Sequence, residues 1–278
     1  MNQKLLILLL LLTFTAIGNR CMALANPDVT PKEIAGNQKW QNTGINNFDL
    51  PIIHFFQQFS QKSKIADESM AFFAGSHLVK GGIIIAIWWF WFLPVTPETI
   101  KRRVMIILSL LASLVALFIG RVLVMTLPYR IRPMNSPELH LTIPFGANFD
   151  GLAKMSSFPS DHAVLFFALS TGLYLASKRV GLFAFLYTLF FISLTRIYLC
   201  YHFPSDVMAG AIIGIAVSYF VCTNNWMQEL GKKIYTFSEK KPQFFYPAFF
   251  LLNYQLIDLF GEMRDITWFF IHHFIHNV

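Results

Sequence analysis

The sequence predicts an all-α fold, a polytopic membrane helical bundle with five core spans that follow an N-terminal signal or anchor helix. Hydrophobic residues make up 55% of the 278 residues and charged residues only 13%, whereas a soluble domain carries about 25% charged residues. The mean hydropathy is +0.51. Several apolar segments approach the roughly 20 residues that cross the hydrocarbon core of a bilayer. Most of the chain is therefore expected to face lipid rather than water.

The first 25 residues have the pattern of an export signal. Lys4 provides a basic start, residues 5–17 form an apolar run, and Ala-Leu-Ala at 23–25 is a small-x-small cleavage site. An uncleaved anchor helix is the alternative, because the apolar run is almost long enough to span. Both interpretations place residues 26–77 outside the membrane, as an extracytoplasmic linker and interfacial helices.

The spanning segments follow as a core domain over residues 78–223. Their predicted limits are about 78–95, 104–127, 161–178, 181–199 and 206–223. Basic clusters occupy alternate loops, at residues 101–103, 178–179 and 232–241. Because loops rich in Lys and Arg remain in the cytoplasm, the loops at 128–160 and 200–205 are expected outside.

Residues 224–278 are predicted to form a cytoplasmic or interfacial tail, with a sixth span within 243–275 as the alternative. The net charge of +7 does not indicate a nucleic-acid partner, because the basic residues are spread over short loops and form no stripe. They serve instead as topology signals and as partners for anionic head groups of the lipid bilayer. The three cysteines have no metal-ligand spacing and predict free thiols.

Polar residues from distant parts of the chain fall at the outer ends of the predicted spans. They are Arg132, Ser160, His162, Arg196, His202 and Asp206. Polar side chains near membrane depth are costly and usually face a cavity or pathway. Arg132 and Arg196 each present a planar fork to phosphate oxygens. Ser160 adds a neutral donor at a helix N-terminus, where the helix dipole favours an anion. The residue types therefore suit phosphoryl transfer.

The two histidines have complementary tasks in such a site. His202 and Asp206 are four residues apart, so on a helix they share one face. Asp206 would accept a hydrogen bond from one ring nitrogen and leave the other aimed at the phosphorus. His162 is left to protonate the departing oxygen. No metal-ligand constellation accompanies these residues, so the site is predicted to use no metal and no other cofactor.

These residues form three motifs that resemble the signatures of the type 2 phosphatidic acid phosphatase (PAP2) superfamily. The motifs are Arg132-Pro133, Pro159-Ser160-Asp161-His162, and Thr195-Arg196 followed by His202 and Asp206. The resemblance covers roughly residues 78–223 and implies an all-helical membrane core that works without metal. It also implies that His202 is the nucleophile, that Asp206 orients it, and that His162 is general acid and later base. It places Arg132, Ser160 and Arg196 around the phosphate.

The motifs depart from the family pattern at three positions. The superfamily has a lysine seven residues before the first-motif arginine, where this chain has Met125. Arg130 and Arg121 are the alternatives for the missing charge. Thr195 replaces the usual serine and keeps a hydroxyl group. Asp161 replaces the usual glycine, a variant that resembles the undecaprenyl pyrophosphate phosphatase branch.

The resulting prediction is an integral membrane lipid phosphatase in the cell inner (cytoplasmic) membrane, with its active site facing the periplasm. Its substrate would be a membrane lipid phosphate such as undecaprenyl pyrophosphate or phosphatidic acid, hydrolysed through a phosphohistidine. A lipid phosphotransferase is one alternative. A non-catalytic transporter or scaffold with a relic site is another, and the departure at Met125 is the feature that favours it.

Overall fold

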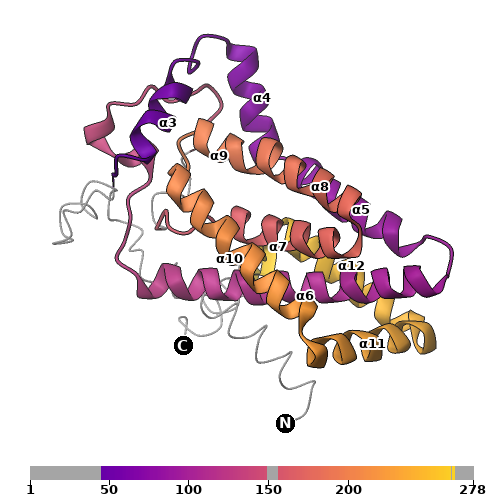
Figure 1. Cartoon of the computed structure of the whole chain (residues 1–278). Helices are drawn as coiled ribbons and strands as arrows, with labels where there is room; N and C mark the ends of the chain where they lie inside the picture. Colours follow the sequence, from indigo (N-terminus) through magenta and orange to yellow (C-terminus); the bar gives the residue numbers. More distant parts are fainter. Residues whose placement is uncertain (1–44, 149–155, 264, 267–278) are drawn as a thin grey trace, which may run out of the picture.

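The computed structural model describes residues 45–148, 156–263 and 265–266, and these residues form helices and no strand (Figure 1). The all-α prediction is therefore confirmed. The predicted signal or anchor helix at residues 1–25 lies outside the described residues, as does the last part of the predicted tail.

Three helices form the centre of the bundle. They are α6 (Pro97–Thr126), α7 (Asp161–Ala176) and α10 (Pro204–Thr223), and α7 packs most extensively against the other two. The apolar residues of α7 surround the helix on every side, which is typical of a helix that is enclosed by protein. Its side chains from Ala163 to Leu173 are accordingly buried. Gly214 lets α10 approach α7 closely, since a Cβ there would lie 2.3 Å from the carbonyl oxygen of Val164.

After α7, one interrupted helix returns the chain to the end of the bundle where α7 begins. It consists of α8 (Lys178–Tyr187), the π-helical turn η4 (Thr188–Ser193) and α9 (Leu194–Tyr198). A π-turn within an α-helix is often found at a functional site. Here η4 directly precedes α9, which carries Arg196.

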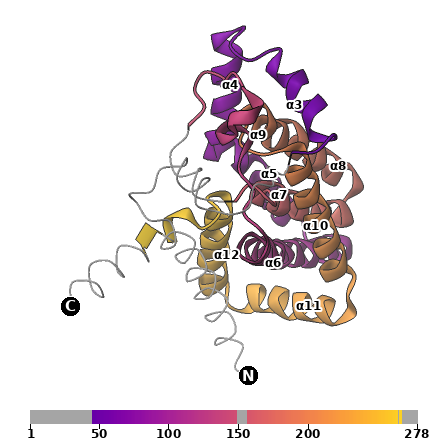
Figure 2. The same cartoon turned by 90° about the vertical axis from the view of Figure 1, so that its left-hand side faces the viewer.

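Two helices cover the same end of the bundle, and a third runs back along its side. They are α3 (Asp49–Gln57), α4 (Lys64–Gly75) and α5 (His77–Trp91). Both α3 and α4 pack against α9, as Figures 1 and 2 show at the top of each view. Helices α4 and α5 meet at a bend of 51°. Ser76 caps α5 at this bend by accepting a hydrogen bond from the Val79 amide.

The last described helices, α11 (Asn225–Lys240) and α12 (Pro242–Ile257), pack against the bundle. Helix α11 lies along α6, and α12 lies against α5 and α11. The indole of Trp91 stacks on Phe245 with ring centroids 5.3 Å apart and donates a hydrogen bond to Tyr246 Oη. Aromatic packing therefore holds part of the predicted tail against the core.

All five predicted spans are helical, but they differ in their capacity to cross a bilayer. In the part of the chain that the structure describes, three segments are long and apolar enough, namely α6, Lys178–Tyr198 and α10. The bent pair of α4 and α5 would bring the number to four. Helix α7 is apolar but has only 16 residues, which rise about 24 Å and fall short of a core about 30 Å thick. The apolar helices indicate a membrane protein.

Candidate active site

The six predicted site residues lie at one end of the bundle, where α7 and α10 begin. Arg132 follows α6, Ser160 and His162 stand at the start of α7, and Arg196 stands near the end of α9. The turn that joins α9 to α10 carries His202, and Asp206 lies in the first turn of α10. In Figure 1 these helix ends lie on the left-hand side. The backbone links two of them directly, since the Ser160 amide donates to the Asp206 carbonyl oxygen at 3.1 Å.

The ring of His202 is held in one orientation. Its Nδ1 lies 2.8 Å from the backbone carbonyl oxygen of Ser157. Because a carbonyl oxygen only accepts, Nδ1 carries the proton and Nε2 keeps a lone pair. Nε2 lies 3.2 Å from Nη1 of Arg132. A guanidinium group only donates, so Nε2 carries no proton and accepts a hydrogen bond from Arg132.

Asp206 acts on His202 less directly than the spacing of the two residues predicts. Its Oδ2 lies 3.8 Å from His202 Nδ1, which is too long for a hydrogen bond. The carboxylate instead accepts from the amide of Phe203 at 2.8 Å and from Ser157 Oγ at 2.5 Å. It turns back toward the N-terminus of its own helix, and Ser157 bridges it to the histidine.

Arg130 connects Asp206 to a further buried carboxylate. Its Nη1 lies 2.5 Å from Asp206 Oδ1, and its Nη2 lies 2.7 Å from Oδ2 of Asp49 on α3. Asp49 also accepts hydrogen bonds from the amide and the hydroxyl of Ser205. Asp49 was missed by the sequence analysis, because nothing near it in sequence belongs to the site.

Neither arginine that was considered for the missing first-motif charge is placed for that task. Arg130 is engaged by two carboxylates, as described above. Arg121 on α6 forms an ion pair of 2.8 Å with Asp161, the residue that departs from the second motif. This pair joins α6 to the start of α7, where the helix dipole favours a carboxylate. Met125 is 40% exposed and has no charge to offer.

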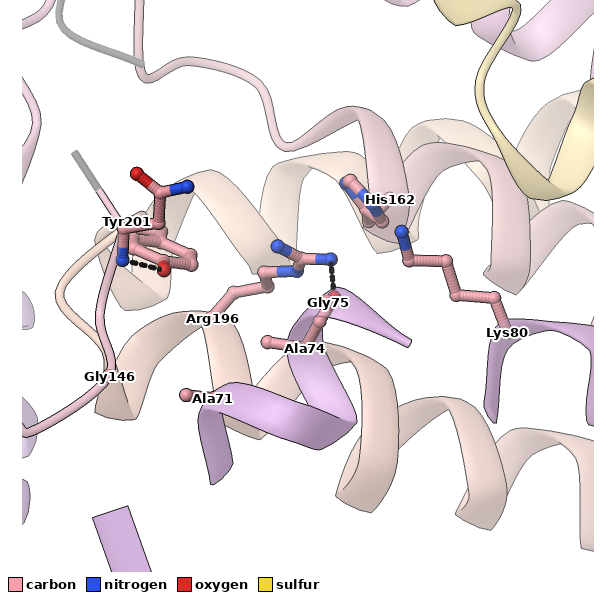
Figure 3. Close-up of a pocket in the computed structure, with 9 residues that line it drawn as sticks. Ala71, Ala74, Gly75, Lys80, Gly146, His162, Arg196 and Tyr201 are labelled. Atoms are coloured by element: carbon pink, nitrogen blue, oxygen red, sulfur yellow. Dashed lines mark hydrogen bonds between the residues drawn. The ribbon is translucent and has the colours of Figure 1, made fainter. Parts of the chain in front are cut away.

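A pocket of about 240 Å³ opens beside these residues (Figure 3). Its polar lining includes His162, Arg196 and Lys80 of α5. Around the site, the buried polar atoms without a hydrogen-bond partner among the described residues include Ser160 Oγ, His162 Nε2 and Arg196 Nε. Buried polar atoms are seldom left unpaired, so this end of the bundle is suited to a polar ligand.

The protonation state of His202 follows from its surroundings. Burial lowers the pKa of His202 below the ordinary value of 6.5, and the charge of Arg132 acts in the same direction, while Asp206 opposes both. The ring is therefore neutral at neutral pH. Within the described ranges, no group of three or more His, Cys, Asp or Glu side chains is placed to hold a metal ion.

The fold and the site together define a helical membrane protein with a cationic, histidine-containing pocket at one end. Residues 104–229 match the family model described as PAP2 superfamily. Over 130 residues the chain is 30% identical to the bacitracin transport permease protein BcrC of Bacillus licheniformis. This match covers 45% of the chain and 57% of the relative, so the chain matches little more than half of that protein's length.

The predicted resemblance to the PAP2 superfamily is thus confirmed over the region from α6 to the start of α11. All six predicted site residues fall within the matched region. The chain is like the membrane phosphatases of this superfamily. Asp49 and Lys80, two residues that the structure adds to the site, lie before residue 104 and therefore outside the matched region.

Proposed function

We propose that this chain is an integral membrane lipid phosphatase that forms a phosphohistidine on His202. The observation that carries the proposal is the His202 ring, whose Nδ1 is held by Ser157 while Nε2 keeps its lone pair beside Arg132. Attack on phosphorus would use this unprotonated Nε2, and Arg132 would turn from the ring to the phosphoryl oxygens.

The reaction has two balanced steps. In the first, Nε2 of His202 forms a bond to phosphorus, the bond from phosphorus to the lipid oxygen breaks, and His162 gives its proton to that oxygen. In the second, His162 takes a proton from water, the water oxygen attacks phosphorus, and the phosphorus–nitrogen bond breaks. Arg132, Arg196 and Ser160 would stabilise the negative charge on the phosphoryl oxygens.

The substrate is proposed to be a lipid monophosphate or diphosphate, such as phosphatidic acid or undecaprenyl pyrophosphate. The protein would act in the inner membrane with the pocket facing the periplasm. The name of the Bacillus licheniformis relative describes a transport permease, which favours transport as the second candidate function. Transport alone would not require two histidines, His202 and His162, at the same end of the bundle.

Phosphate release by purified protein in lipid nanodiscs tests the proposal. We expect wild-type protein to release phosphate from at least one lipid phosphate, and His202→Ala to abolish release while remaining folded. His54→Ala is the matched control, because His54 is an exposed histidine on α3. Radiolabel from the substrate should remain on wild-type protein in an acid-labile form and should be absent from His202→Ala. Near-normal activity of His202→Ala would overturn the nucleophile.

The same assay distinguishes hydrolysis from transfer of the phosphoryl group to another lipid. If the label moves to a second lipid instead of to water, the protein is a phosphotransferase with the same nucleophile. If wild-type protein releases and transfers no phosphate from any lipid, transport becomes the better explanation of the site.

A further inference from the structure

Lys80 is a buried cation that the motifs do not include. It lies in the second turn of α5 and is 9% exposed. No ion pair or hydrogen bond involves its ammonium group within the described residues. Removing an ammonium group from water without a partner is costly. An anion bound in the pocket would therefore be favoured beside Lys80, since no described residue forms an ion pair with its ammonium group.

The ammonium group faces the candidate active site. Lys80 lines the same pocket as His162 and Arg196, and Figure 3 shows its nitrogen pointing toward the His162 ring. Arg196 repels the Lys80 ammonium, and Asp258 attracts it from beyond ion-pair distance. Two mutually repelling cations at one pocket are stabilised when an anion binds between them.

Lys80 lies on the leaving-group side of the pocket. The charges that act on His162 include those of Arg196 and Lys80, whereas those that act on His202 come from Arg132, Asp206 and Arg196. The charge of Arg196 thus acts on both histidines, whereas the charge of Lys80 acts on His162 and not on His202. In the proposed function, His162 is the residue that meets the departing oxygen.

We propose that Lys80 binds a second phosphate group, the one that leaves with the lipid, and so makes the pocket selective for lipid diphosphates over lipid monophosphates. This inference rests on the proposed function. Lys80 would also replace the first-motif lysine. The family has that lysine at the position of Met125 on α6, whereas Lys80 lies on α5.

The chemistry differs between the two substrate classes at the leaving group. With a diphosphate, Nε2 of His202 bonds to the terminal phosphorus, and the bond from that phosphorus to the bridging oxygen breaks. The electron pair stays on the bridging oxygen of a lipid monophosphate, which takes the proton of His162. Lys80 remains protonated and donates hydrogen bonds to this anion. With a lipid monophosphate, the departing group is an alcohol and offers Lys80 no phosphate.

A pair of substrates with one lipid chain isolates the effect of the second phosphate. The value of kcat/KM is measured with farnesyl diphosphate and farnesyl monophosphate for wild type, Lys80→Met and Lys80→Arg in nanodiscs. We expect Lys80→Met to lose about 100–1,000-fold with the diphosphate, the usual cost of one charge-stabilising contact. The loss with the monophosphate should be less than about tenfold, and Lys80→Arg should keep part of the preference.

Stability and a control variant complete the test. Lys80→Met removes a buried charge that has no ion-pair partner among the described residues, so its Tm is expected to stay the same or rise. Lys62→Met, at an exposed lysine between α3 and α4, should change neither substrate's kcat/KM. Equal losses with both substrates, no loss with the diphosphate, or a lowered Tm for Lys80→Met would each overturn the role of Lys80. A wild-type protein that hydrolyses neither substrate would instead overturn the proposed function.

Discussion

Arg130 and Asp206 form a buried ion pair in which Nη1 of the arginine lies 2.5 Å from Oδ1 of the carboxylate. The other terminal nitrogen of Arg130 contacts Asp49 at 2.7 Å. One guanidinium group thus joins α3, which covers the site, to α10, which follows His202. Through Ser157, the same network reaches the ring of His202.

Replacing Arg130 by methionine should destabilise the protein and disorder the site. The substitution leaves the carboxylates of Asp49 and Asp206 buried without their shared cation, and removing one partner of a buried ion pair typically costs about 3–5 kcal/mol. We expect a lowered Tm and a lowered kcat, with Arg130→Lys intermediate because lysine lacks the fork. Thermal unfolding in detergent and phosphate release measure both effects.

An exposed arginine provides the comparison for this substitution. Arg179→Met, in the first turn of α8, removes a solvent-accessible charge and should leave both Tm and kcat near the wild-type values. A Tm for Arg130→Met equal to that of Arg179→Met would show that the buried network does not hold the two helices together.

The pH dependence of kcat/KM should report the lowered pKa of His202. The nucleophile must be neutral, and burial together with Arg132 lowers its pKa below 6.5. Activity is therefore retained as the pH falls to 6.5 and is lost only when the pH passes through the lower pKa. Asp206 raises the pKa of His202, so the acid limb of Asp206→Asn should move to still lower pH. If kcat/KM of the wild type already falls above pH 6.5 because His202 becomes protonated, the pKa of His202 is not lowered and the prediction is wrong.

Gly214→Ala should destabilise the protein by forcing α7 and α10 apart. A Cβ at this position would lie 2.3 Å from the carbonyl oxygen of Val164 and 2.9 Å from the amide nitrogen of Ala168. Both are backbone atoms, so the helices must move, and overpacking of this kind costs about 1–3 kcal/mol. The measurement is Tm in detergent.

Gly81→Ala on α5 is the matched control for this prediction. A Cβ there would meet only Ile257 Cδ1 at 3.8 Å, an ordinary contact. Since alanine favours helix more than glycine does, Gly81→Ala should keep or raise Tm. A Gly214→Ala variant as stable as Gly81→Ala would mean that α7 and α10 pack more loosely than the structure has them.

The helices could be predicted from the sequence because the apolar residues of each helix are close together in the chain. Apolar length and loop charge placed all five core segments, and motif spacing placed His162, His202 and Asp206 at one end of the bundle. The hydrogen bonds of Asp206 were not predictable in the same way. They depend on Ser157, which lies 49 residues earlier in the chain and reaches Asp206 only in the folded protein.

Asp49 and Lys80 could not be predicted as site residues either, because they reach the site only through contacts between distant parts of the chain. Asp49 meets Ser205, 156 residues away, through the packing of α3 over the start of α10. Lys80 is a single cation in a segment that is otherwise apolar on every face. Hydropathy identifies such a segment as a helix but does not say which of its faces turns toward the site.

The orientation of the bundle can be tested with reporter fusions at the loop positions. Basic residues at 101–103 and 232–241 predict that fusions near residues 99 and 235 report the cytoplasm. A fusion near residue 145, in the loop that leads to the site, should report the outside. A cytoplasmic signal at residue 145 would place the pocket on the opposite side of the membrane from the one proposed.

The last prediction is that Arg132 and Arg196 carry the phosphate charge without help from a divalent metal. Each side chain is nearly buried at the site, and phosphoryl transfer spreads negative charge over the equatorial oxygens. Losing one such contact typically lowers the rate by about 100–1,000-fold. Arg132→Ala and Arg196→Ala should each fall in that range, and lysine at either position should restore activity only in part.

The metal requirement is measured on the same purified protein. Excess chelator should leave the wild-type rate unchanged, because the proposed charge stabilisation comes from guanidinium groups, Ser160 and the amides at the start of α7. Vanadate should inhibit by adopting the five-coordinate geometry of the transferred phosphoryl group. A rate that collapses in chelator and returns with magnesium would show that a metal ion, rather than the arginines alone, neutralises the phosphate. The Arg132→Ala and Arg196→Ala losses would then be expected to shrink as the magnesium concentration rises.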